Sequence, residues 1–124
     1  MSQDIIADTL NEIMNAKRAG KSSIITKKHS KVLIGVMKIA KENNYILDYK
    51  IDGTKMEITA GELNECRAIK PRFNVTLGSY DKYMRRFLPA RNMGIIIVST
   101  NKGLMTHIEA IEKNLGGALI AYFY

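Results

Sequence analysis

The chain has 124 residues, of which 46% are hydrophobic and 25% are charged, values typical of a globular protein with one domain or two small subdomains. No apolar run approaches the roughly 18 residues of a membrane span. The first ten residues carry two acids and no Lys or Arg, so we expect no signal peptide. The single cysteine, Cys66, excludes an internal disulfide and suits a reducing cytoplasm.

Positive charge is unevenly distributed along the chain, whose net charge is +7. Residues 17–41 hold eight Lys or Arg and no acid, residues 42–65 hold six acids against two Lys, and residues 67–102 hold eight bases against one acid. Two basic blocks folded onto one side would form the positive footprint that a polyphosphate backbone selects. The alternative is a generally basic, solvated surface.

The first elements alternate between helix and strand. Apolar spacing predicts an amphipathic helix over 4–19, with Gly20 as its C-terminal stop. Residues 23–26 are β-prone and predict a short strand. Ser30 is a typical N-cap for a second helix, which we expect to end near 43–44.

The next segment changes from a helical period to a period of two. Leu47, Tyr49 and Ile51 alternate with charged residues, and a similar alternation follows the Asp52-Gly53 dipeptide, which is typical of hairpins. One face of this hairpin is apolar and two helices are available to cover it. We therefore predict an N-terminal α/β subdomain of order α-β-α-β-β over residues 1–62.

The second half begins at a joint between 61 and 67. Residues 66–77 predict two short strands or one broken strand, because Pro71 blocks a helix and prefers an edge. A short helix follows over 79–87, and Pro89 ends it.

A buried strand over 95–98 leads into a polar loop, residues 99–103, and Thr106 to Glu109 has the spacing of a capping box that starts a helix. Residues 114–117 end this helix, and 118–124 form a last strand that ties the C-terminus into a sheet. The fold class is therefore α+β with two small subdomains, the second being mostly antiparallel sheet with short helices over residues 63–124.

The polar loop offers hydrogen-bonding groups on short tethers. Ser, Thr and Asn each donate and accept, and holding them still loses little side-chain entropy. A rigid strand and a helix start hold this loop between them, which suits recognition of a ligand. The same arrangement also occurs in most α+β domains without a functional role.

Several segments together resemble a known family. The stretches STNKGLMTHIEA and KNLGGALIAYFY, with Ile-Lys-Pro-Arg-Phe upstream and an N-terminal Asp-Ile-Ile-Ala-Asp-Thr-Leu-Asn, are similar to the S-eight family of small-subunit ribosomal proteins in its archaeal and eukaryotic style. The resemblance spans nearly the whole chain in the same order and spacing.

The resemblance implies a structural constituent of the small ribosomal subunit, in the cytoplasm and without cofactor, metal or catalytic residues. Such a protein binds a central-domain helix of 16S-type ribosomal RNA, helps to assemble the platform and contacts neighbouring small-subunit proteins. The implied RNA-reading residues are Ser99, Thr100, Asn101, Lys102 and Gly103, with Gly116 and Gly117. Many relatives carry glutamate after the glycine pair, where this chain has Ala118, so any contact made by that carboxylate is in doubt.

A division of roles follows for the RNA contacts. The short polar side chains of the loop suit irregular bases or the shallow minor groove of A-form RNA, and we expect them to give recognition. Cations bind phosphates and give affinity. The cations expected to do so are Arg18, Lys27, Lys28 and Lys31.

An alternative is a small basic enzyme acting on RNA, with Ser99, Thr100 or Cys66 as nucleophile and His107 as base. Arg67 could lower the pKa of Cys66. We expect His107 to face solvent at its helix start. Neither His29 nor His107 has a second His or Cys at ligand spacing, which disfavours a metal site. Tyr80 and Tyr83 suit either base stacking or helix packing.

Overall fold

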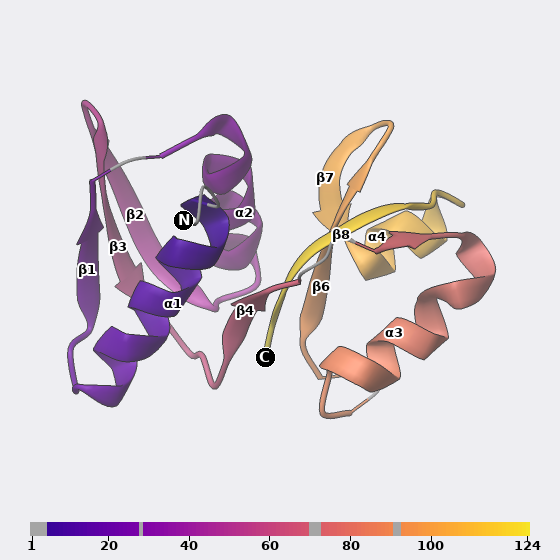
Figure 1. The fold of residues 1–124 in the computed structure, drawn as a ribbon, viewed down its shortest axis with the longest axis horizontal. Coiled ribbons are helices and arrows are strands. Elements are labelled where there is room, and N and C mark those ends of the chain that lie inside the picture. The colour runs from indigo at the N-terminus through magenta and orange to yellow at the C-terminus, as the bar shows by residue number, and fades with distance from the viewer. Residues whose placement is uncertain (1–4, 28, 70–72, 91–92) are drawn as a thin grey trace. The chain divides into compact units, whose positions relative to one another are not determined.

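A computed structural model describes residues 5–27, 29–69, 73–90 and 93–124 (Figure 1). Lys28, one of the expected phosphate contacts, and Pro71 lie outside these residues. The chain forms two compact units, Met1–Arg67 (unit 1) and Ala68–Tyr124 (unit 2). This division lies within strand β4 (Cys66–Ala68), a few residues after the predicted boundary. Both units combine helices with antiparallel strand pairs, which confirms the α+β class.

Unit 1 has the predicted order of helix, strand, helix, strand and strand. Its elements are α1 (Ile5–Arg18), β1 (Ser23–Thr26), α2 (Lys31–Glu42), β2 (Ile46–Asp52) and β3 (Lys55–Ala60). The strands form an antiparallel sheet in the order β1-β3-β2 (Figure 1). Asp52 pairs with Lys55, so the two-residue turn of the hairpin is Gly53-Thr54, one residue later than the dipeptide that predicted it.

Helix α2 begins at its predicted N-cap, and both helices of unit 1 end near their predicted stop signals, whereas the predicted start of the first helix at residue 4 lies outside the described residues. The Ser30 hydroxyl accepts a hydrogen bond from the Leu33 N–H at 3.2 Å, as expected of an N-cap. Gly20, two residues after the end of α1, has a φ of +78°, and Asn44, two residues after the end of α2, has a φ of +68°. Asn tolerates this left-handed conformation better than other side chains do, and so it can end a helix as glycine does.

The core of unit 1 lies between the helices and one face of the sheet. Leu10 and Leu33 from the helices are fully buried, as are Met56 and Ile58 from β3. The residue between these two, Glu57, is exposed. The alternation shows that one sheet face is covered and the other faces solvent.

Unit 2 is built on a sheet with a central strand pair. Its helices and strands are β5 (Asn74–Val75), the 3₁₀ turn η1 (Leu77–Ser79), α3 (Tyr80–Phe87), β6 (Ile95–Thr100), β7 (Gly103–Thr106), α4 (His107–Glu112) and β8 (Gly117–Phe123). The sheet has the order β4-β8-β6-β7, and β5 also pairs with β8. Helices α3 and α4 lie on one face (Figure 1), where Tyr80 and Ala110 pack with Val98 and Leu119.

The predicted polar loop is instead the end of a β-hairpin. Strand β6 continues to Thr100, which pairs with Gly103, and the turn is only Asn101-Lys102. Strand β7 was not predicted. It forms because Met105 is buried in the core of unit 2 and because its neighbours complete the antiparallel ladder with β6.

Candidate RNA-binding interface

The site begins where the buried part of β6 ends. Ile96, Ile97 and Val98 have no exposed surface, whereas Ser99 is exposed. Strand β6 lies between β7 and β8, so the backbone of Ser99 is paired on both sides, with Leu104 of β7 and Ala118 of β8. The Ser99 hydroxyl is therefore presented from a position with little freedom to move.

The hairpin turn is held by one hydroxyl. Thr100 Oγ1 donates a hydrogen bond to the Gly103 carbonyl at 2.9 Å and accepts one from the Lys102 N–H at 3.1 Å. Asn101, Lys102 and Gly103 are exposed. Thr100 thus shapes the turn, while its neighbours in the turn present their side chains to solvent. Gly103 has a φ of +109°, which side-chain-bearing residues rarely adopt.

The predicted glycine pair lies against the same strand end. A Cβ on Gly117 would collide with the carbonyl oxygen of Ser99, and one on Gly116 would lie 2.5 Å from the carbonyl oxygen of Val75. Only glycine therefore allows the start of β8 to approach β5 and β6 this closely. The structure brings together the polar segment and the glycine pair, which the sequence separates.

A row of paired residues crosses the sheet at this point. Asn74 of β5 lies opposite Ala118, Ala118 opposite Ser99, and Ser99 opposite Leu104. Paired residues share one face of a sheet, and successive residues of a strand point to opposite faces. Val98, the residue before Ser99, packs in the core with α3 and α4, so the row that contains Ser99 lies on the opposite face. Exposed Asn74 therefore joins the candidate site. Sequence reasoning missed it because its two-residue strand carries no motif.

Two hydrogen bonds fix the segment leading to the glycine pair. Helix α4 ends at Asn114, whose φ is +59°, and the Leu115 N–H donates to the Ala110 carbonyl at 2.8 Å. The Tyr80 hydroxyl donates to the Leu115 carbonyl at 2.8 Å. Tyr80 is only 2% exposed, so of its two possible roles the structure supports helix packing over base stacking.

The expectation that His107 faces solvent is wrong. The side chain is 2% exposed, and its Nδ1 accepts a hydrogen bond from the Ile96 N–H at 3.1 Å. Ile96 lies just beyond the last residue of β6 that pairs with β7, so the His107 ring supplies the acceptor for its N–H. Burial lowers the pKa of His107, because the charged imidazolium would lose its hydration. Of the two bonds of the predicted capping box, the structure shows the one in which Thr106 Oγ1 accepts from the Glu109 N–H at 3.2 Å.

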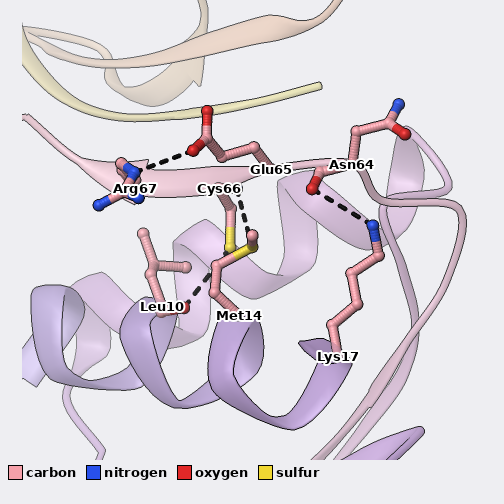
Figure 2. A network of polar contacts seen from close by, with 7 residues as sticks. All are labelled: Leu10, Met14, Lys17, Asn64, Glu65, Cys66 and Arg67. Atoms are coloured by element: carbon pink, nitrogen blue, oxygen red, sulfur yellow. Dashed lines mark hydrogen bonds and ion pairs between the residues drawn. The ribbon is translucent and has the colours of Figure 1, made fainter. Parts of the chain in front are cut away.

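The Cys66 thiol is buried, and Arg67 does not make it acidic. Figure 2 shows the thiol directed onto α1, where Sγ lies 3.7 Å from the Leu10 carbonyl oxygen and the Cys66 N–H donates to Met14 Sδ at 3.4 Å. Burial raises the pKa of this thiol to about 12. The guanidinium of Arg67 does not offset this effect, since its Nε lies 3.0 Å from a carboxylate oxygen of Glu65.

The structure does not show the nucleophile–base pair that the enzymatic alternative predicts for unit 2. Among the described residues of that unit, no hydrogen bond joins His107 to Ser99 or Thr100. A nucleophile and its base must lie within hydrogen-bonding distance of each other. Among the same residues, no group of three or more His, Cys, Asp or Glu side chains is arranged to bind a metal ion. None of the described helices is long and apolar enough to cross a membrane.

Three of the cations predicted in unit 1 lie within the described residues, at the ends of different elements. Lys27 follows β1 and Lys31 begins α2, and both are exposed. Arg18 is exposed at the C-terminal end of α1, whereas Lys27 lines a groove together with Ile5 and Asp8 from the N-terminal part of that helix.

Comparison with known proteins identifies the family. The sequence profile described as "Ribosomal protein S8" matches residues 4–124. The chain belongs to this family. It is also 42% identical, over 129 aligned positions, to a protein of Nanoarchaeum equitans (strain Kin4-M) named "Small ribosomal subunit protein uS8", and the alignment covers 100% of both sequences. Membership in the ribosomal protein S8 family confirms the resemblance found in the sequence.

Proposed function

We propose that this S8-family chain is a structural constituent of the small ribosomal subunit in the cytoplasm and that it binds 16S-type ribosomal RNA through unit 2. The RNA-reading surface would be the end of the β6–β7 hairpin together with Gly116 and Gly117. The observation that carries this proposal is the close approach of Gly117 to Ser99, which brings the polar segment and the glycine pair together at one end of a sheet.

The chemistry of this surface suits folded RNA. The major groove of a regular A-form helix is too narrow for side chains, so a protein reads irregular bases or the shallow minor groove with its 2′-hydroxyl groups. The Ser99 hydroxyl and Asn101 amide can each donate to and accept from such groups. Gly103, whose Cβ position is open, has no side chain that would keep the RNA sugars at a distance, whereas Gly116 and Gly117 let β8 lie close to β5 and β6.

Charge supplies the second part of the proposal. Lys102 is exposed at the tip of the hairpin, next to the recognition surface. In unit 1, the exposed cations Arg18, Lys27 and Lys31 would contact phosphates at separate points, and Lys28 would join them. Such contacts strengthen binding to any RNA and make it salt-dependent, whereas base and sugar contacts distinguish the cognate helix.

The RNA bound would be a helix of the central domain of the small-subunit RNA, and binding there would help to assemble the platform beside neighbouring ribosomal proteins. Family membership supports these finer statements.

Footprinting with hydroxyl radicals tests the proposal directly. The full chain is mixed with small-subunit ribosomal RNA, and we expect it to protect one irregular helix of the central domain. The same samples analysed on a denaturing gel should contain intact RNA. Uniform protection of the whole RNA, or its cleavage by the protein, would contradict the proposal.

A further inference from the structure

Strand β1 has an unpaired edge. It pairs on one side with β3 and has no strand on its other side among the described residues of unit 1. The Ala60 N–H donates to the Ser22 carbonyl at 2.8 Å. In an antiparallel pair, every second residue of a strand makes the backbone hydrogen bonds to the same neighbour, so Ile24 also bonds to β3. The N–H and C=O groups of Ser23 and Ile25 therefore point away from β3, toward the free edge.

A groove of about 380 Å³ runs beside this edge, between β1 and the first half of α1. Thr9 and Thr26 are buried and lie at its base, while Asp8 and Glu12 line it from α1. Ile25 is 63% exposed, an unusual value for an isoleucine in a strand. The groove thus combines free backbone groups, an apolar side chain and two carboxylates.

The charge of the groove differs from that of the chain as a whole. Asp8 and Glu12 are exposed one helical turn apart, and neither forms an ion pair with any described residue. The groove is lined by these two carboxylates and one cation, Lys27, in a chain whose net charge is +7. Carboxylates repel RNA phosphates and attract Lys and Arg, which favours a basic polypeptide as the occupant.

We propose that the free edge of β1 binds an extended basic segment of a neighbouring protein, which adds to the sheet as a further strand. Backbone hydrogen bonds to Ser23 and Ile25 would hold the segment. Because side chains alternate along a strand, Lys or Arg would face Asp8 and Glu12, and apolar residues would pack beside Ile25. Lys27 lies at one end of the groove, where it disfavours a further cation.

The test uses the full chain and two synthetic peptides with blocked ends, one alternating Lys with Val and the other alternating Glu with Val. We expect the Lys-Val peptide to bind and to slow hydrogen exchange at the amides of Ser23 and Ile25. The Glu-Val peptide has the same β-propensity and should not bind. Binding of the Lys-Val peptide without slower exchange at these two amides would overturn the proposal.

A pair of charge-matched variants identifies the groove. Asp8→Lys with Glu12→Lys should weaken binding of the Lys-Val peptide at least tenfold, because the attraction becomes repulsion. Glu42→Lys with Glu62→Lys changes the net charge equally at exposed positions outside the groove and should change affinity less than about twofold. Circular dichroism checks that both variants fold. Equal weakening by the two pairs would refute the proposal.

A third variant tests the backbone contact. Ile25→Pro removes an N–H that points to the free edge and leaves the ladder to β3 intact. We expect loss of Lys-Val peptide binding with an unchanged circular dichroism spectrum. Undiminished binding by this variant would show that the segment does not add to β1.

Discussion

The proposed recognition surface of unit 2 and the cation-bearing surface of unit 1 are built on opposite principles. In unit 2, short side chains and glycines lie at the end of a central strand whose preceding residues are fully buried. In unit 1, Lys and Arg lie exposed at the ends of α1, β1 and α2. The first surface depends on the position of its backbone, and the second depends mainly on charge.

Because of this difference, the two surfaces should tolerate different substitutions. A group on a short tether keeps its place only if the scaffold keeps its place, so the unit 2 surface should be sensitive to substitutions in the core that never touch RNA. A long cationic side chain adapts to small displacements of its backbone. Substitutions beneath the unit 1 cations should therefore change stability without changing RNA recognition.

The largest expected effect comes from Gly117→Ala. The added methyl group would collide with the Ser99 carbonyl oxygen, and separating β8 from β6 should cost about 2 kcal/mol of folding free energy. RNA affinity should fall as well, because the two halves of the surface separate. Gly78→Ala is the control, since nothing lies within 4 Å of its Cβ. Chemical denaturation and filter binding measure both variants; equal stabilities would show that β8 can move without cost.

The next effect concerns the hydrogen bond beneath the surface. Tyr80→Phe leaves the Leu115 carbonyl without its buried partner and should destabilise unit 2 by about 1 to 2 kcal/mol. Tyr83→Phe is the matched control, because Tyr83 is partly exposed and packs through its ring, 5.3 Å from the centroid of Phe73. Denaturation midpoints compare the two. Similar midpoints would show that the Tyr80 hydroxyl does not stabilise the segment before the glycine pair.

A direct comparison of the two surfaces uses Ser99→Ala and Lys31→Ala. Loss of the Ser99 hydroxyl should weaken cognate RNA binding about fivefold and leave the salt dependence unchanged. Loss of Lys31 should reduce the slope of log K against log salt by roughly one and affect cognate and unrelated duplexes alike. Titrations at several salt concentrations measure both. If both variants affect cognate and unrelated duplexes equally, the division of roles fails.

Sequence patterns predicted unit 1 well because its signals are local. Helical periodicity, the Ser30 cap and the Gly20 stop each lie within a few residues of the feature that they determine. The recognition surface depends instead on pairing between β6 and β8, which are distant in sequence. A register shift between Ile97 and Val98 in that pairing determines that Ser99 lies opposite Ala118. No local pattern shows such a shift.

Burial determines the pKa of both Cys66 and His107, and neighbours in sequence do not show it. His107 was therefore wrongly expected to face solvent. A polar residue within a partly apolar segment shows its burial only when the packing is known. The same limit explains why β7 was missed, since its four residues form a strand only against β6.

The smallest expected effect is a pH dependence that should distinguish the units. Because burial lowers the pKa of His107 in the folded state, the unfolded chain takes up a proton first as the pH falls below about 6.5. The stability contributed by neutral His107 is complete above that pH, and it decreases until the folded-state pKa is reached. His107→Gln can still accept from the Ile96 N–H but does not titrate, so it should lose less stability between pH 7.5 and 5.5. In hydrogen exchange, the amides of β6 and β7 should lose more protection between these two pH values in the wild-type chain than in the variant. A difference of the same size in unit 1 would mean that His107 does not act through the scaffold of the recognition surface.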